Sequence, residues 1–320
     1  MRSKLLILAF LTLFGGCSIT GYTSYQKPVN EEISINAYFC PQEDCSGIVA
    51  KEIASAKNSA HCAFYSVNLD DVIDSLVEKS KTADVKLVTD NDNPTNLPFA
   101  VTDNRNGLMH DKFCVIDENT VITGSYNPTI GGLQDNNNVV IIRSTTLAKN
   151  YEAEFQEFQA GVFGKGNRVK NPVIYYANGT KKIENYFCPE DWCSDKVLKT
   201  LAKANISDNF MVFSLTDDSI GDLLVKEHSE GIDVKGVVEK SQNTNEYSEY
   251  FKLEDADIDV RYDKNPKLLH HKVFIIDRKI VITGSYNPTR NGDKVNDENI
   301  LIIYDEDIAK LFLEEFERLY

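Results

Sequence analysis

The sequence predicts an α/β fold made of two tandem α/β sandwich repeats with mixed β-sheets, related by a pseudo-twofold axis. The chain repeats itself: the letters YFCP at residues 38–41 return at 186–189, and residues 110–129 return at 270–289. Within each copy, amphipathic stretches alternate with short β-branched runs. This alternation favours helices packed against a mixed sheet.

We expect the elements of the first copy in the following order: a helix over 47–57, a strand at 63–66, a helix over 70–81, strands at 85–89, 113–116, 121–123 and 139–142, and a closing helix over 147–158. The second copy repeats this order with about twelve additional residues around 241–252. The predicted organisation is a signal peptide (1–17), a linker (18–31), a first repeat (32–160), a Gly- and Asn-containing linker (161–180) and a second repeat (181–320).

The first residues resemble an export signal. Arg2 and Lys4 precede an uncharged apolar run over residues 5–14, which is too short for a membrane span of roughly 20 residues. The following Gly-Gly-Cys makes Cys17 a lipidation candidate, similar to the lipobox of bacterial lipoproteins. We therefore expect an exported protein, with a membrane-surface anchor if Cys17 carries lipid.

The chain is acidic. Its formal net charge is −15, and about −17 once Arg2 and Lys4 are removed. This charge repels polyanions over most of the surface, so a nucleic-acid substrate would need a locally basic groove. Charge alone excludes neither a nucleic acid nor a lipid.

Six cysteines follow Cys17, and four of them form two pairs with matching spacing: Cys40 with Cys45, and Cys188 with Cys193. In an exported protein, such pairs favour short disulfides. The alternative is one structural zinc site built from all four thiolates. The remaining two, Cys62 and Cys114, lie in apolar runs and are expected to be small buried thiols.

Each copy carries a His and a Lys two residues apart at the start of a predicted strand. Because side chains alternate along a strand, His110 and Lys112 face the same side, as do His270 and Lys272. A cation suits the oxygens of a phosphodiester, and an imidazole can attack phosphorus or move a proton near neutral pH. Two copies can divide these two tasks if their hairpins meet.

A tight turn over residues 117–120 is expected to link two strands into a hairpin. If the hairpin pivots between Glu118 and Asn119, Asn127 lies opposite His110 and Ser125 opposite Lys112. The same construction in the second copy places Asn287 opposite His270 and Ser285 opposite Lys272. We find no carboxylate cluster suited to a two-metal mechanism, so we expect neither a metal nor another cofactor.

The pattern HxKxxxxD followed by GSxN, present twice with the same spacing and the same GSYNPT segment, resembles the signature of the phospholipase D superfamily. The resemblance covers essentially the mature chain, and the compact repeats are similar to the small nucleases of that superfamily. It implies a phospholipase D-like fold and a covalent phosphohistidine intermediate resolved by water or an alcohol. His110 would be the nucleophile and His270 the general acid. The phosphate would be bound by Lys112, Lys272, Asn127 and Asn287, aided by Ser125 and Ser285.

The remaining motif residues receive different expectations. Asp117 and Asp277 belong to the motif, but we expect them to shape the hairpin turns. Glu298 fits the carboxylate that orients the His of the second copy. The first copy has Asn137 and Asn138 instead, so the two sites should differ and the order of their roles could be reversed.

Residues outside the motif receive structural roles. His61 and His228 are expected at the surface or at helix caps, His271 in packing or solvent, and Trp192 in local packing. The acidic closing helix over residues 305–320 is expected to present a solvated face.

The sequence favours an enzyme that hydrolyses a phospholipid headgroup bond. The alternatives are an endonuclease of the same superfamily and a catalytically silent phosphate-binding surface module. Both motifs lie on one chain, which predicts a monomer with an internal pseudo-dimer.

Overall fold

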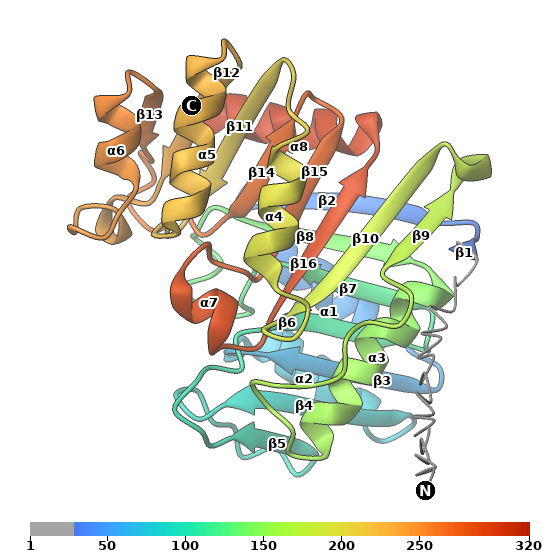
Figure 1. The fold of residues 1–320 in the computed structure, drawn as a ribbon. Coiled ribbons are helices and arrows are strands. Elements are labelled where there is room, and N and C mark those ends of the chain that lie inside the picture. The colour runs from blue at the N-terminus through green and yellow to red at the C-terminus, as the bar shows by residue number, and fades with distance from the viewer. Residues whose placement is uncertain (1–28) are drawn as a thin grey trace, which may run out of the picture.

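The computed structural model describes residues 29–320, and its chain forms two β-sheets that face each other across shared helices (Figure 1). The predicted signal peptide, Cys17 and most of the first predicted linker lie outside the described residues. The seven-stranded sheet of the first half has the order β2 (Ser34–Cys40), β8 (Asn137–Arg143), β7 (Thr120–Gly124), β6 (Lys112–Ile116), β3 (Ser59–Phe64), β4 (Asp84–Asp90) and β5 (Ala100–Asp103). Both parallel and antiparallel pairs occur in it, so the predicted mixed sheet is confirmed.

The second sheet repeats this topology and is extended at one edge. Its order in the described chain is β1 (Val29–Asn30), β9 (Val173–Tyr176), β10 (Lys181–Cys188), β16 (Glu298–Tyr304), β15 (Ile280–Gly284), β14 (Lys272–Ile276), β11 (Ser207–Val212), β12 (Asp233–Val238) and β13 (Asp259–Tyr262). Strands β1 and β9 come from the two predicted linkers, and β1 pairs in parallel with β9. Both linkers therefore contribute to a sheet.

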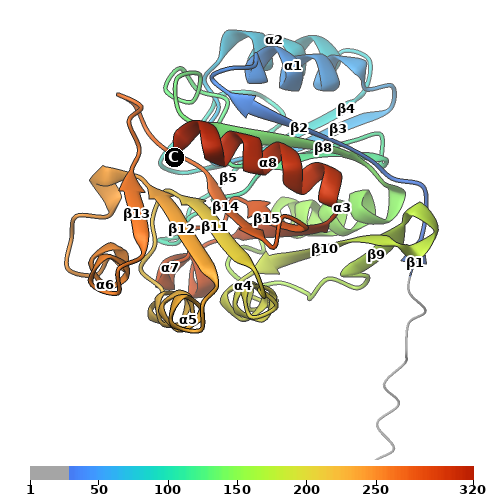
Figure 2. The same cartoon turned by 90° about the horizontal axis from the view of Figure 1, so that it is seen from above.

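The helices form three layers around the two sheets (Figure 2). The outer layer of the first half holds α1 (Cys45–Ser55) and α2 (Asp70–Lys79). The outer layer of the second half holds α4 (Cys193–Leu201), α5 (Asp218–Ser229), α6 (Tyr250–Asp255) and α7 (Arg290–Lys294). Between the sheets lie α3 (Thr145–Gln159) and α8 (Glu306–Leu319); η1 (Ala177–Gly179) and η2 (Lys240–Gln242) are single 3₁₀ turns.

The central helices α3 and α8 explain how the halves are held together. Ser144 caps α3 by accepting from the Leu147 backbone N–H, and Asp305 caps α8 in the same way through Asp307. Their apolar side chains, including Phe155 and Phe312, join one continuous core with residues of both sheets. The closing helix α8 is amphipathic as expected: Glu306, Lys310 and Glu314 are exposed on its solvated face, while its other face is covered and includes the buried Glu315.

Most of the predicted elements exist, with shifts of a few residues. The strand expected at 63–66 is β3 at 59–64, because the polar residues Ser59 and His61 also pair with β4. Strands β2 and β5 were not predicted. Strand β2 alternates exposed and half-buried residues at the sheet edge, which gives little continuous apolar signal.

Three disulfides are present, and each lies within one half. Cys40–Cys45 and Cys188–Cys193 confirm the expected short pairs, so the zinc alternative is wrong. Cys62 and Cys114, expected as free thiols, form a third disulfide, because they are direct cross-strand partners on β3 and β6. Disulfides of this kind are typical of an oxidising, extracytoplasmic environment.

Candidate active site

Each motif His lies at a point where the two halves exchange backbone contacts. Met109, just before His110, forms an isolated parallel bridge with Asp297, and Leu269, just before His270, forms one with Asn136. The His110 backbone N–H donates to the Asp297 carbonyl at 2.9 Å, and the His270 N–H donates to the Asn136 carbonyl at 2.8 Å. Each His is therefore held by the opposite half, and the two motifs meet at the interface.

A cross-half clamp fixes the first of these bridges. Arg105 donates to the Asp103 carboxylate at 2.8 Å and to the Val295 carbonyl at 3.0 Å, and it also binds the carboxylate of Asp297. Asp297 is buried and further accepts from the Gly164 backbone N–H at 2.5 Å. These contacts thus fix the start of β16, where Glu298 directly follows Asp297.

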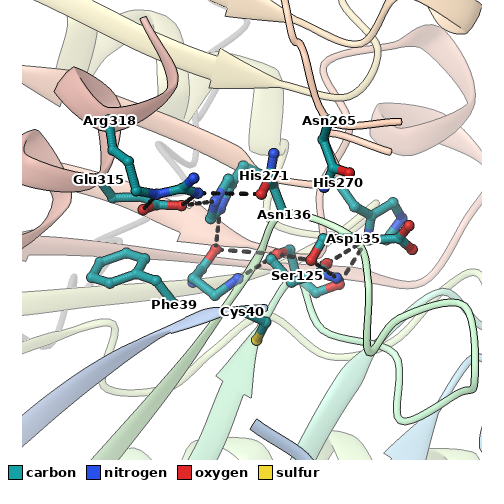
Figure 3. Close-up of polar contacts among 12 residues, drawn as sticks. Phe39, Cys40, Ser125, Asp135, Asn136, Asn265, His270, His271, Glu315 and Arg318 are labelled. Carbon is teal, nitrogen blue, oxygen red and sulfur yellow. Dashed lines mark hydrogen bonds and ion pairs between the residues drawn. The ribbon is translucent and has the colours of Figure 1, made fainter. Parts of the chain in front are cut away.

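The imidazole partners are exchanged between the halves. His110 Nδ1 lies 2.7 Å from Glu298 Oε2. His270 Nδ1 lies 2.9 Å from Asn137 Oδ1 and 3.0 Å from the Ser125 carbonyl oxygen (Figure 3). The expectation that Glu298 orients the His of its own copy is therefore wrong: β16 points Glu298 across the interface, and it contacts His110. The two sites differ, as expected: one His has a carboxylate partner, and the other has an amide partner.

These contacts leave the other ring nitrogen of each His for chemistry. A carbonyl oxygen only accepts, so His270 Nδ1 carries a proton, and Nε2 is the ring nitrogen left without this contact. No hydrogen bond within residues 29–320 reaches Nε2 of either ring. Tyr65 packs edge-on against His110 with ring centroids 5.1 Å apart, and Phe213 packs on His270 at 5.0 Å. Both rings are thereby fixed.

Two buried ammonium groups share this site. Lys112 Nζ donates to the His110 carbonyl at 2.5 Å, and Lys272 Nζ donates to the His270 carbonyl at 2.7 Å. Neither forms an ion pair with a carboxylate in the described chain. Two nearly buried cations without a direct counter-ion favour the binding of an anion.

The pKa values of these groups reflect burial and mutual repulsion. Burial lowers the pKa of Lys112 to about 8, although the Glu298 and Asp111 carboxyls raise it. Burial, followed by Lys112, lowers the pKa of Lys272 well below its usual value. Burial and both ammonium groups lower the pKa of His110 and of His270. An anion that enters this site would relieve the repulsion and favour the charged forms.

Glu298 is fully buried, and burial raises its pKa to about 8. The Lys112 charge opposes this rise, as do the donors Ser285 Oγ at 2.7 Å and Asn296 Nδ2 at 3.2 Å. Ser125 plays the corresponding part in the other half, since its hydroxyl donates to Asn137 at 3.2 Å. The two serines therefore orient the partners of the two His side chains.

The hairpin register differs by one residue from the prediction. Cys114 pairs with Ile122 and Ile116 with Thr120, so neither Asn127 nor Ser125 lies directly opposite His110 or Lys112. Asp117 and Glu118 both have positive φ, and the Asn119 N–H donates to the Ile116 carbonyl. The turn is therefore centred on Asp117 and Glu118, which leaves Asn119 as an extra loop residue. The second hairpin shows the same shift.

The asparagines of the GSYN segments are half-buried at the site. Asn127 Oδ1 and Asn287 Oδ1 are buried and have no hydrogen-bond partner among residues 29–320.

Asp117 and Asp277 lie at the opposite end of their strands. There they accept backbone N–H groups of residues 57–59 and 205–207, respectively, which matches the expected turn-shaping role.

Sequence reasoning missed a polar layer behind the two His side chains. His271, expected in packing or solvent, is fully buried and lies 3.2 Å from both Asn138 and Glu315 (Figure 3). At the equivalent place in the first half, the Asn299 amide donates to Asp111 at 2.5 Å, and burial raises the pKa of Asp111 to about 7. Asp111 and His271 occupy equivalent positions in the two repeats. This equivalence was the signal in the sequence that could have revealed the polar layer.

One other expectation needs correction: His61 is buried rather than exposed, since its ring stacks on Phe155 and contacts Glu152 at 2.9 Å. Trp192 is about half exposed and packs locally under the Arg168 guanidinium, 3.7 Å from its ring centroid, in line with the expected role. The described residues hold no group of three or more His, Cys, Asp or Glu side chains arranged for a metal ion. Among residues 29–320, no helix has the length and apolar content needed to cross a membrane.

Comparisons with known proteins agree with this geometry. The family described as "Cardiolipin synthase, PLD-like domain" matches residues 49–159 and 197–320, one segment in each half. A phospholipase D of Rickettsia conorii is 34% identical over 135 residues, which cover 42% of this chain and 68% of the relative. The human mitochondrial cardiolipin hydrolase is 34% identical over 125 residues, 39% of this chain and 50% of that protein.

The fold of the whole chain also has a solved counterpart. The phosphatidylserine synthase of Haemophilus influenzae superposes with a TM-score of 0.67 over 88% of this chain and 85% of its own, at 13% identity. That similarity concerns the fold alone. With two matched family segments and two HxKxxxxD motifs that meet at one interface, the chain belongs to the phospholipase D-like family and is a phosphodiesterase hydrolase of that superfamily.

Proposed function

We propose that the protein hydrolyses the headgroup phosphodiester of a phospholipid through a phosphohistidine at His110. The observation that supports this most directly is the composite site: two imidazoles from opposite halves, each held at Nδ1, beside two ammonium groups without carboxylate partners. Lys112 and Lys272 bind the non-bridging phosphate oxygens, and the amides of Asn127 and Asn287 add hydrogen bonds.

The reaction has two steps. His110 Nε2 attacks phosphorus and forms a P–N bond, while the bond from phosphorus to the headgroup oxygen breaks. His270 donates its Nε2 proton to that leaving oxygen. Water then attacks phosphorus, its proton passes to His270 Nε2, and the P–N bond breaks to release the phosphate monoester. Atoms and protons balance, and both His side chains return to their initial states.

The exchanged partners favour this division of roles. A phosphorylated imidazole with a proton on Nδ1 carries positive charge, which lowers the pKa of the neighbouring Glu298 and is stabilised by its carboxylate as an ion pair. His270 must lose and regain a proton in each cycle. Its neutral partner Asn137 does not hold it in the charged form.

The surroundings of the site support a lipid over a nucleic acid. The loop after Asn127 exposes Ile130 and Leu133, which are 66% and 40% accessible. A buried carboxylate lies at the end of a strand in each half: Asp90 is the last residue of β4, and Glu239 follows β12; the whole chain has a net charge of −15. A polyanion would be repelled by this environment, whereas a lipid diester needs only one phosphate site and apolar contacts.

We also propose that the protein is exported and anchored to a membrane surface by lipid on Cys17, and that it acts as a monomer. The short apolar run before Cys17 and the three disulfides support export.

The test is turnover by the mature chain in excess chelator, on phospholipid vesicles and on single-stranded DNA in parallel. We expect headgroup release from the vesicles and no cleavage of the DNA. Cleavage of DNA alone would replace the lipid substrate with a nucleic acid. No turnover of either would favour a phosphate-binding module without catalysis.

A further inference from the structure

The segment that connects the two halves carries a cluster of cations, although the chain as a whole is acidic. Residues 160–172 join α3 to β9 and contain Lys165, Arg168 and Lys170, all of which are exposed. Lys149, exposed on α3, lies with Arg168 and Lys170 around a recess of about 450 Å³. We call these four residues the basic surface. Within residues 29–320, none of the four forms an ion pair with a carboxylate.

The carboxyl groups next to the basic surface do not cancel its charge. Glu154 lines the same recess but is buried, and burial raises its pKa well above the usual value. Burial also raises the pKa of Glu190 to about 7. The carboxylate of Glu157 accepts hydrogen bonds from Asn167, and that of the buried Asp191 accepts backbone N–H groups. The basic surface therefore keeps a net positive charge at neutral pH.

An exposed aromatic side chain adjoins the basic surface. Trp192 is 47% accessible, and the Arg168 guanidinium lies over its ring, 3.7 Å from the centroid. A tryptophan beside exposed cations is typical of surfaces that lie between water and the headgroup layer of a bilayer, because the ring enters that layer while the cations contact lipid phosphates. The chemistry of this surface therefore fits an anionic membrane.

The first described strand begins next to the basic surface. Val29 of β1 pairs with Ile174 of β9, four residues after Lys170. Figures 1 and 2 show β1, β9 and α3 on the same side of the molecule. The lipidation candidate Cys17 precedes Val29 by twelve residues, and a chain of that length spans at most about 40 Å. A lipid on Cys17 would therefore hold this side of the protein close to a membrane.

We propose that the basic surface and Trp192 dock the protein onto an anionic phospholipid bilayer. The proposal rests on the membrane location proposed above, but it requires neither a lipid on Cys17 nor catalysis. It accounts for the approach of a chain with a net charge of −15 to a membrane of the same sign: the exposed cations face the lipid phosphates, and the acidic remainder faces away.

The test measures binding of the mature chain to vesicles, with Cys17→Ser so that no lipid is attached. The vesicles contain phosphatidylcholine alone or with about 30 mol% phosphatidylglycerol, which supplies the negative charge. Trp192 is the single tryptophan of the chain, so its fluorescence reports on the proposed contact. We expect sedimentation with the anionic vesicles and a blue shift of this fluorescence, both weakened by about 0.5 M NaCl, and neither with phosphatidylcholine alone.

Neutralising the segment should weaken this binding. Each exposed cation near a membrane surface contributes about fivefold to the partition coefficient, so Lys165→Gln/Arg168→Gln/Lys170→Gln should lower it about 100-fold. The same variant should hydrolyse a water-soluble diester at the wild-type rate, because none of the three residues contacts the composite site. Binding to anionic vesicles as tight as that of the wild type would overturn the proposal.

A matched control removes the same amount of charge elsewhere. Lys81, Lys226 and Lys310 are each more than half exposed and lie after α2, on α5 and on α8, respectively. Lys81→Gln/Lys226→Gln/Lys310→Gln should bind anionic vesicles as tightly as the wild type. An equal loss in this variant would show that net charge, and not the basic surface, governs binding, and would also overturn the proposal.

Two further results separate docking from the other proposals. If single-stranded DNA bound through the segment and anionic vesicles did not bind, the basic surface would belong to a nucleic acid and the docking proposal would be wrong. Binding to anionic vesicles without turnover of any diester would instead refute the proposed catalysis and leave the docking surface standing. Turnover of a water-soluble diester by a chain that does not bind the vesicles would do the reverse.

Discussion

The two halves of the molecule share a backbone plan but differ in the charges placed at equivalent positions. Glu298 in the second half corresponds to Asn137 in the first, and His271 corresponds to Asp111. Because each half orients the His of the other, the single carboxylate acts on His110 and the amide on His270. The comparison teaches that a duplicated fold can form one composite site whose two equivalent His side chains have different hydrogen-bond partners.

Replacing either His should have the largest effect on turnover. Substrates with different leaving groups should distinguish the two variants. His110→Ala should abolish turnover of every diester, because no P–N bond can form. His270→Ala should lower turnover of a phospholipid about 10²–10⁴-fold. It should still show a rapid burst of 4-nitrophenol from a 4-nitrophenyl diester, whose leaving group needs no proton, followed by slow turnover because the second step lacks its base. Equal rescue of both variants would contradict the division of roles, and circular dichroism controls for folding.

A smaller effect should follow from the exchanged partners. Glu298→Gln removes the charge beside His110 and should lower kcat about 10- to 100-fold, as expected for a lost hydrogen bond to a charged group. Asn137→Asp places a charge beside His270 and should shift the basic limb of the kcat pH profile upward, because it stabilises the imidazolium. The profiles are measured from pH 5 to 9. If Glu298→Gln shifted only the basic limb of the kcat profile, which reports on His270, Glu298 would not be the functional partner of His110.

The three disulfides close loops of different length, so they should contribute differently to the free energy of unfolding. Cys62–Cys114 closes a separation of 52 residues, whereas Cys40–Cys45 and Cys188–Cys193 close separations of 5. Loop entropy predicts losses of about 4 and about 2 kcal/mol, respectively, when each pair is replaced by alanine. Urea unfolding measures the difference. If replacing Cys62 and Cys114 lowered the free energy of unfolding less than replacing a short-loop pair, loop entropy would not be the main effect. Residual structure in the denatured state, or packing at the site of substitution, would then outweigh it.

The smallest expected effect concerns pH. Asp208 and Glu227 of the second half are buried without hydrogen-bond partners in the described chain, and their counterparts in the first half are Ala60 and Lys79. Burial raises the pKa of Glu227 to about 7 and that of Asp208 well above its usual value.

A raised pKa means that the folded state binds the proton more tightly, so this stability is present at low pH and is lost as pH rises through about 7. Glu227→Gln should therefore raise Tm at pH 8 relative to the wild type, with little change at pH 5. The exposed Glu314→Gln serves as the control. An equal shift of Tm at both pH values would exclude titration as the cause.

Much of the fold and site could be predicted because the chain repeats both its motifs and its apolar runs. The spacing of His110 and Lys112, repeated at 270 and 272, identified two of the site's elements and their shared face. The exchange of partners could not be predicted, because it depends on how the two sheets pack, and a repeat alignment relates Glu298 to its own copy. The Cys62–Cys114 disulfide was missed because cross-strand pairing is a long-range property that no local spacing reports.

The division of roles is tested most directly by trapping the covalent intermediate. The His270→Ala variant is mixed with a 4-nitrophenyl diester, quenched at alkaline pH within milliseconds, digested and analysed by mass spectrometry. We expect the phosphoryl group on the peptide that contains His110, and no label on that peptide in the His110→Ala variant. A phosphoryl group found on His270 in the wild type or in Glu298→Gln would reverse the roles of the two halves and contradict the mechanism.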